Sequence, residues 1–202
     1  MNPGEGRLNA TERRMIKVAL VLLTAAVMLV FFSGRGEAET QLDTAADGLT
    51  DANAQRMLDE GKQTFRFDTF GDEAFWTDAL QLHRAIAGAN LGGVGPGVSP
   101  KTALAVGLKV DSTALPQSLI SQLKRGRVNL DDPATTLALL KLNAVVGVKG
   151  TFRADGSFQS VGITCALCHS TVDNSLAPGI GQRLDGWANR DLNVGAIVAL
   201  SP

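Results

Sequence analysis

The sequence has few of the residues that form disulfide frameworks or metal clusters. Its 202 residues include two cysteines and two histidines. Two cysteines form at most one disulfide, so a fold held together by several disulfides is excluded and apolar burial must stabilise the domain. Basic charge is also scarce, because residues 39–202 carry 14 basic and 17 acidic side chains. This balance argues against a nucleic-acid-binding surface.

Long apolar runs are limited to one segment near the N-terminus. Val18–Phe32 is interrupted only by Thr24, and four basic residues precede it, Arg7, Arg13, Arg14 and Lys17. This flanking charge predicts that the start of the chain stays inside the cytoplasmic membrane and that the remainder is exported.

The length of this run leaves two fates open. Its fifteen residues are intermediate in length between the core of a signal peptide and a full membrane span of about 17 to 25 residues. Small residues at Gly36 and Ala38 permit cleavage after Ala38, whereas an uncleaved segment over residues 16–34 would anchor the protein. The anchor is slightly favoured.

The rest of the chain, 45% hydrophobic and 19% charged over the whole sequence, suits one globular domain. Residues 39–49 are small and acidic without periodicity, which predicts a linker. The first expected helix begins near Thr50 and has a buried stripe of Ala54, Met57, Leu58, Gly61 and Phe65. Further helices are expected at Asp72–Ala87, Pro100–Leu108, Pro116–Arg125 and Pro133–Val146. Asp131 or Asp132 is expected to cap the last helix.

Two extended stretches follow the last expected helix. Val148–Arg153 and Ser157–Ile163 are joined at Asp155–Gly156, a dipeptide typical of a two-residue hairpin turn. The second stretch leads directly into Cys165-Ala166-Leu167-Cys168-His169.

The pentapeptide carries the clearest chemistry in the sequence. Its spacing lets one helical turn present Cys165 and Cys168 to the two vinyl groups of a haem, while His169 reaches the iron. The alternatives are a buried cysteine pair with a hydrogen-bonded histidine, and a dithiol oxidoreductase whose cysteines open a helix after a strand. The adjacent histidine and the export segment favour haem c, covalently attached, with His169 as the metal ligand.

On these residues the chain resembles the c-type cytochromes, chiefly the single-haem class I proteins and the haem domains of bacterial di-haem cytochrome c peroxidases. Two further stretches are similar to class I: Gly61-Lys62-Gln63-Thr64-Phe65, and Leu184-Asp185-Gly186-Trp187-Ala188-Asn189-Arg190. The resemblance implies that Leu184 and Trp187 wall the haem crevice and that Arg190 approaches a propionate. A surface arginine is the alternative for Arg190.

The chain departs from class I after the motif. No methionine follows His169, and 33 residues remain, so the usual methionine ligand and closing C-terminal helix lack counterparts. The helix is expected to be lost, replaced by residues 70–160, or removed by shortening of the chain. The sixth iron position is left to His83, to Met57 or to no side chain, and packing is favoured for both residues.

These observations predict a mainly α, cytochrome c-like haem domain with a helical insertion and one short β-hairpin. Residues 1–38 are the signal or membrane anchor, residues 39–49 the linker, and residues 50–202 the haem domain, with its haem segment at residues 160–192. The expected function is single-electron transfer in the periplasm, with redox proteins as partners. The chain is also expected to be bound to the membrane if the N-terminal segment is uncleaved. A peroxidase-like haem protein with an open iron site and a Cys-x-x-Cys thiol–disulfide oxidoreductase are the alternatives, so enzymatic activity stays open.

Overall fold

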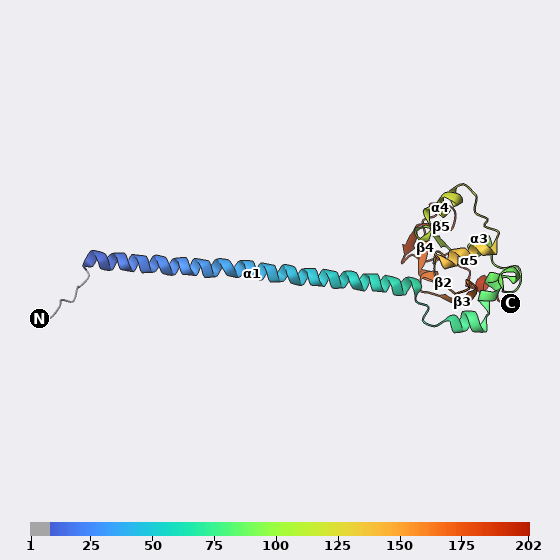
Figure 1. Cartoon of the computed structure of the whole chain (residues 1–202), viewed down its shortest axis with the longest axis horizontal. Coiled ribbons are helices and arrows are strands. Elements are labelled where there is room, and N and C mark those ends of the chain that lie inside the picture. Colours follow the sequence, from blue (N-terminus) through green and yellow to red (C-terminus); the bar gives the residue numbers. More distant parts are fainter. Residues whose placement is uncertain (1–8) are drawn as a thin grey trace. The chain divides into compact units, whose positions relative to one another are not determined.

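The structure, a computed structural model, describes residues 9–202, except for the side chains of residues 30–46. Arg7 and the side chains around the expected cut after Ala38 lie outside the described residues. The first element is one long helix, α1 (Ala10–Phe67), shown in Figure 1. Within the described residues, no helix is both long and apolar enough to cross a membrane.

Helix α1 differs from two local predictions. It continues through residues 39–49, where an irregular linker was predicted, because that segment has no proline and Gly48 is its only glycine. The predicted buried stripe is wrong for its first four positions, since Met57 and Leu58 are 61% and 68% exposed. Only Phe65 of that stripe packs against a core cluster.

The chain divides into two compact units, Met1–Leu58 and Asp59–Pro202. In the second unit, the helix predicted over Asp72–Ala87 is split into a π-helical turn, η1 (Ala74–Ala79), and α2 (Leu82–Ala87). Gln81 separates them in a left-handed conformation, with φ at 50°. A non-glycine residue in this conformation interrupts the regular helical backbone.

Three later helices follow their predicted starts. They are α3 (Pro100–Ala105), α4 (Gln117–Lys124) and α5 (Pro133–Lys141). Ser99 caps α3 by accepting from the amide of Thr102, and Asp132 caps α5 by accepting from Ala134. These helices begin where expected because caps and first-turn prolines act locally.

The predicted hairpin is present as β2 (Val148–Phe152) paired with β3 (Phe158–Ile163). Its turn differs from the two-residue form. The Gly156 amide donates to the Arg153 carbonyl and the Arg153 amide donates to Ser157, while Gly156 has φ at 84°. This is a three-residue loop that ends in a left-handed glycine.

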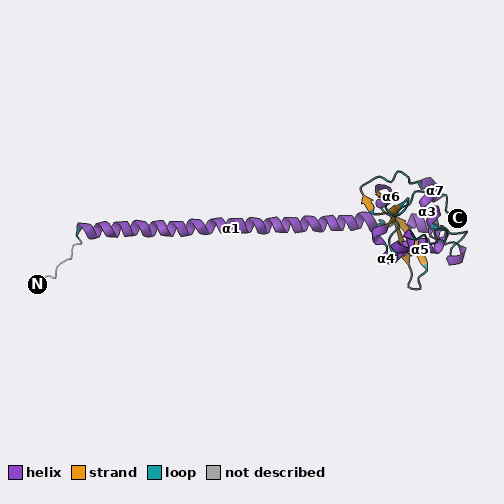
Figure 2. Ribbon diagram, turned by 90° about the horizontal axis from the view of Figure 1, so that it is seen from above, coloured by secondary structure: helices purple, strands orange, loops and turns teal. Residues whose placement is uncertain are grey.

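The remaining strands are very short. They are β1 (Val110–Asp111), β4 (Ser170–Val172), β5 (Ile180–Gly181) and β6 (Arg183–Asp185). β1 pairs in parallel with β5, and β4 pairs antiparallel with β6, so residues 9–202 contain three two-stranded sheets. Figure 2 shows these strands set among the short helices.

The prediction of a mainly α, cytochrome c-like fold is therefore wrong. The chain is mixed α/β, about 52% helix and 13% strand with small sheets, and α1 supplies 58 of the helical residues. Strand β4 begins at Ser170, directly after His169. Strands of two or three residues have too few positions for a hydrophobic period, so the sequence pattern did not indicate them.

The core of Asp59–Pro202 lies between η1, α2, α5, the hairpin and the terminal helix α7 (Val194–Val198). Its most buried members include Leu140 and Val161, which are 2% and 1% exposed. A second, smaller cluster joins Val146, Ala166 and Val172 to Phe65. This second cluster lies directly under the Cys-x-x-Cys-His segment, because Ala166 belongs to both.

Candidate haem attachment site

Strand β3 leads into a single helical turn that carries the motif. Cys165 precedes α6 (Ala166–His169), and the two intervening residues, Ala166 and Leu167, are 0% and 3% exposed. Cys165, Cys168 and His169 are all exposed, and both cysteines are free thiols. Positions i, i+3 and i+4 share one face of a helix. The structure therefore brings the three predicted site residues together on the solvent side of α6.

The backbone of this turn is held from both sides. The Thr164 amide donates to the Gly147 carbonyl at 3.0 Å, ahead of the motif. After the motif, the backbone amide of Asn189 donates to the Cys168 carbonyl at 2.9 Å. The backbone amide of Gly186 donates to the His169 carbonyl at 2.8 Å. These bonds fix the positions of the residues that carry the thiols and the imidazole.

Gly147 is needed for the close approach on the first side. Its φ is 76°, and an added Cβ would lie 2.2 Å from the backbone nitrogen and Cα of Leu167. Only glycine adopts this conformation readily and also leaves room for the neighbouring backbone. The motif turn can therefore pack on residues 145–148 only with glycine at position 147.

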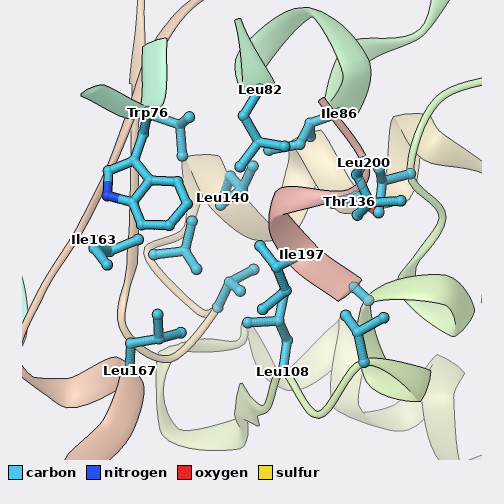
Figure 3. A pocket seen from close by; sticks show the side chains of 16 residues that line it. Trp76, Leu82, Ile86, Leu108, Thr136, Leu140, Ile163, Leu167, Ile197 and Leu200 are labelled. Atoms are coloured by element: carbon cyan, nitrogen blue, oxygen red, sulfur yellow. The ribbon is translucent and has the colours of Figure 1, made fainter. Parts of the chain in front are cut away.

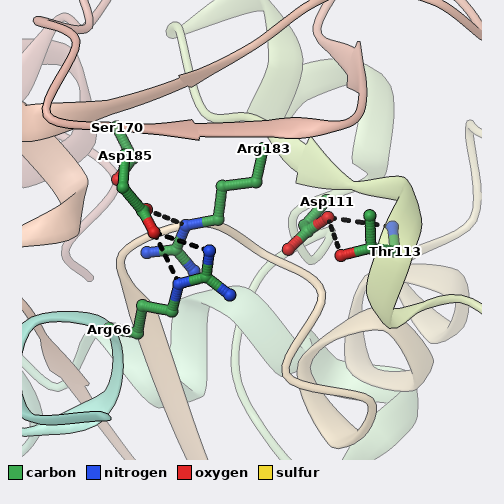
Figure 4. A network of polar contacts seen from close by, with 6 residues as sticks. All are labelled: Arg66, Asp111, Thr113, Ser170, Arg183 and Asp185. Carbon is green, nitrogen blue, oxygen red and sulfur yellow. Dashed lines mark hydrogen bonds and ion pairs between the residues drawn. The ribbon is translucent and has the colours of Figure 1, made fainter. Parts of the chain in front are cut away.

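A cluster of charged side chains centred on Asp185 supports the strand that follows His169 (Figure 4). Asp185 Oδ1 accepts from Ser170 Oγ at 2.7 Å and from Arg183 Nε at 2.6 Å. Asp185 Oδ2 accepts from Arg66 Nε at 2.7 Å, and Arg66 Nη2 lies 2.6 Å from the same oxygen. The cluster ties the end of α1 and strand β6 to Ser170, the residue next to His169.

The electrostatics of this cluster favour the ionised carboxylate. Burial raises the pKa of Asp185, but hydrogen bonds from Ser170 and Arg66 and the charge of Arg183 outweigh burial, so the pKa is lowered. Burial lowers the pKa of Arg183, and the charge of Asp185 opposes this decrease. The Arg183 side chain is 3% exposed and pairs with Asp185, so Arg183 is a buried cation whose partner is this carboxylate.

Phe65 also reaches the motif. It packs against the cluster of Val146, Ala166 and Val172, although 100 residues separate it from Cys165. The stretch that resembles the end of the first class I helix is thus in contact with the motif turn.

The residues expected to wall and edge a haem crevice face solvent. Leu184 is 36% exposed and pairs with Thr171, while Trp187 is 67% exposed in the loop between Gly186 and Asn189. Arg190 is exposed too, which is compatible with both the propionate contact and the surface alternative. The cavities described in the chain are lined by other residues than Cys165, Cys168 and His169.

The structure separates His83 from the motif. His83 on α2 contacts Phe158, with ring centroids 6.5 Å apart. Phe158 begins β3, about 20 Å from Cys165 at the usual rise of a strand. Burial, followed by the charge of Arg84, lowers the pKa of His83, so the ring packs in its neutral form near pH 7.

Met57 lies in the other compact unit and is 61% exposed. All four methionines precede Asp59, so none belongs to the unit that carries the motif. Within Asp59–Pro202, therefore, His83 lies away from His169 and no methionine is available as a second iron ligand.

The sequence did not indicate several residues that build this site, namely Arg66, Gly147, Ser170 and Asn189. Arg66 and Asp185 are 119 positions apart, and nothing in their local sequence predicts that they pair. Asn189 lies inside the stretch over residues 184–190 that is similar to class I, but its contact with Cys168 depends on the fold of the loop.

The residues present fit covalent haem attachment, because both thiols are free and face the same side as His169. Comparisons with protein-family models, curated proteins and solved structures find no match to this chain.

Proposed function

We propose that the chain carries one haem c, attached through Cys165 and Cys168 with His169 on the iron, and that it passes single electrons. The observation that supports this best is the orientation of α6. The turn buries its two non-motif residues and exposes both thiols and the imidazole. A macrocycle can reach all three groups from solvent without unfolding the core.

This orientation disfavours the other two interpretations of the motif. Structural cysteines are normally buried, whereas Cys165 and Cys168 are exposed. A reactive dithiol is activated by a helix N-terminus or a neighbouring cation. Here α6 has four residues, and the nearby cations Arg66 and Arg183 are bound to Asp185.

The haem would supply the redox chemistry, and the protein would supply attachment, orientation and electrostatics. Cys165 and Cys168 would hold the group, and His169 would bind its iron. The amides of Gly186 and Asn189 donate to the carbonyls of His169 and Cys168. Asp185 accepts from Ser170, the residue that follows His169. These contacts would hold the backbone that carries the imidazole in a fixed position.

In this proposal His169 would be the only residue of Asp59–Pro202 that binds the iron, because His83 lies at the far end of β3 and the unit contains no methionine. An open position would admit small external ligands. This favours the peroxidase-like alternative as the second candidate, with the chain acting alone or as a subunit.

The proposed setting is the outer side of the cytoplasmic membrane, in the periplasm, with residues 16–34 as a possible anchor and redox proteins as partners. The basic flank of Val18–Phe32 supports export. Export also agrees with the chemistry, since exposed thiols that await haem attachment belong in a compartment where that attachment is performed.

The test is production of the full chain in a host that attaches haem to exported Cys-x-x-Cys-His proteins. We expect a reduced-minus-oxidised spectrum of haem c, and haem that stays with the protein in acid-acetone and on denaturing gels. Cys165→Ala with Cys168→Ala should lose this acid-stable haem, whereas His83→Ala should keep it. Colourless wild-type protein that reduces disulfides would identify a dithiol oxidoreductase instead.

A further inference from the structure

The main core contains an apolar cavity of about 50 Å³ (Figure 3). Figure 3 shows Trp76, Leu140, Ile163, Leu167 and Ile197 around it, contributed by η1, α5, β3, α6 and α7. The cavity is several times larger than the roughly 10–15 Å³ that one water molecule requires. Its contents therefore depend on the chemistry of its wall.

The wall is unsuited to water. All of its lining residues are apolar except Thr136, and no polar atom contributes to its surface. A buried water needs two to four polar partners, and the side chains of the wall offer at most one, the hydroxyl of Thr136. Cavities lined by aliphatic and aromatic side chains stay dry and accept small apolar molecules.

We propose that this cavity is a binding site for a small apolar molecule of the size of a diatomic gas. Leu167 gives the site its relation to the motif, because its side chain lines the cavity while the flanking Cys165 and Cys168 face solvent. One residue layer thus separates the cavity from the attachment face. Use of the site to store a gaseous ligand of the iron, such as dioxygen or nitric oxide, rests on the proposed function.

Xenon is the probe, because it is apolar, polarisable and chemically inert. The full chain would be labelled at the methyl groups of leucine, isoleucine and valine, and methyl spectra recorded under increasing xenon pressure. We expect saturable shifts for the methyls of Ile163, Leu167 and Ile197. Leu119 and Leu123 line the separate groove beside α4 and should not show them.

Ala103 provides a matched pair of variants with Ala105 on the same helix. Ala103 lines the cavity and is 8% exposed, whereas Ala105 is exposed. The side chain of alanine is a single Cβ, so Ala103→Val adds two carbons toward the cavity, and Ala105→Val adds them toward solvent. Ala103→Val should lose the saturable shifts, and Ala105→Val should keep them.

A second variant enlarges the cavity, so its result does not depend on whether Ala103→Val fills it. Val161 lines the cavity and is 1% exposed. Val161→Ala removes two carbons from the wall, so xenon should bind at lower pressure than in the wild type.

Shifts that rise linearly at every methyl, equally in the Ala103 and Ala105 variants, would overturn the proposal. So would ordered water detected next to Leu167 in the cavity. Xenon binding is measured without reference to haem. Saturable binding in a colourless protein would thus retain the site and reject the proposed function, whereas acid-stable haem without xenon binding would do the reverse.

Discussion

At the scale of single residues, Asp185 is the charged side chain whose loss is predicted to affect stability most. It is the only carboxylate bound to Arg66, Arg183 and Ser170 among the described residues. Asp185→Asn should lower the free energy of unfolding at pH 7 by about 2 kcal/mol, because charged hydrogen bonds are lost and Arg183 stays buried. Urea unfolding measures this loss. Asp131→Asn is the matched control, since its ion pair with Lys101 is largely exposed and worth less than about 1 kcal/mol.

The same carboxylate predicts an acid dependence. The pKa of Asp185 is lowered from its ordinary value of 3.8 by Ser170, Arg66 and Arg183, which outweigh burial. The folded state therefore binds its proton less readily than the unfolded chain does. The stability that Asp185 contributes is complete above about pH 4 and is lost as the pH falls through the lowered folded pKa.

Unfolding curves between pH 2 and pH 6 measure this dependence. The difference between wild type and Asp185→Asn should be constant near pH 6 and should shrink below pH 4. A difference that persists at pH 2 would show that the variant acts by altered packing and not by loss of the charge.

The two histidines allow a paired test of iron ligation, which depends on the proposed haem. His169→Ala should shift the Soret band of the reduced protein, because the iron loses the imidazole that would bind it. His83→Ala should leave the spectrum unchanged, since His83 contacts Phe158 at the far end of β3. Reduced protein should bind carbon monoxide equally before and after His83→Ala. Carbon monoxide binding that appears only in the His83 variant would place His83 on the iron.

At the scale of elements, the contact between residues 145–148 and α6 determines where the thiols lie. Gly147→Ala would place Cβ 2.2 Å from the Leu167 backbone and would strain a residue with φ at 76°. We expect a loss of stability above about 3 kcal/mol, because the backbone must move and the left-handed conformation disfavours alanine.

Gly126→Ala is the matched control for this substitution. Gly126 also has a positive φ, at 63°, but nothing lies within 4 Å of the added Cβ. Its cost should be about 1 kcal/mol, from the backbone conformation alone. Thermal unfolding of both variants separates close approach from conformational strain, and equal losses would contradict the role given to Gly147.

The elements also show which parts of the fold the sequence could predict. Pro100 and Pro133 follow their caps Ser99 and Asp132, and both helices start there, because capping depends on adjacent residues. The pairing of β4 with β6 was not predicted, because each strand has three residues and no period. The periodic residues of α1 before Phe65 predicted a buried stripe, yet periodicity shows only that a face is apolar.

The candidate site divides in the same way. Spacing alone predicted Cys165, Cys168 and His169 as the candidate site, since the Cys-x-x-Cys-His motif lies within one helical turn. The contacts that hold this turn come from Gly147, Gly186 and Asn189. Such contacts arise between distant segments, and a single sequence has no local signal for them.

At the scale of the whole molecule, the boundary between the two compact units falls inside α1, between Leu58 and Asp59. The last turns of this helix belong to the unit that carries the motif. Phe65 packs against Ala166, and Arg66 binds Asp185. Residues 59–202 should therefore fold alone, with the melting temperature of the same transition in the full chain.

A shorter fragment, residues 69–202, tests whether the end of α1 contributes to the site. It lacks Phe65 and Arg66, so it loses a partly buried aromatic contact and the ion pair with Asp185, together about 3 kcal/mol. For a domain of this size the melting temperature should fall by roughly 10 °C. Calorimetry of the two fragments measures the difference, and haem staining reports attachment in each. Equal melting temperatures would mean that residues 59–68 contribute nothing to the stability of the unit, and that the Asp185 cluster is stable without Arg66.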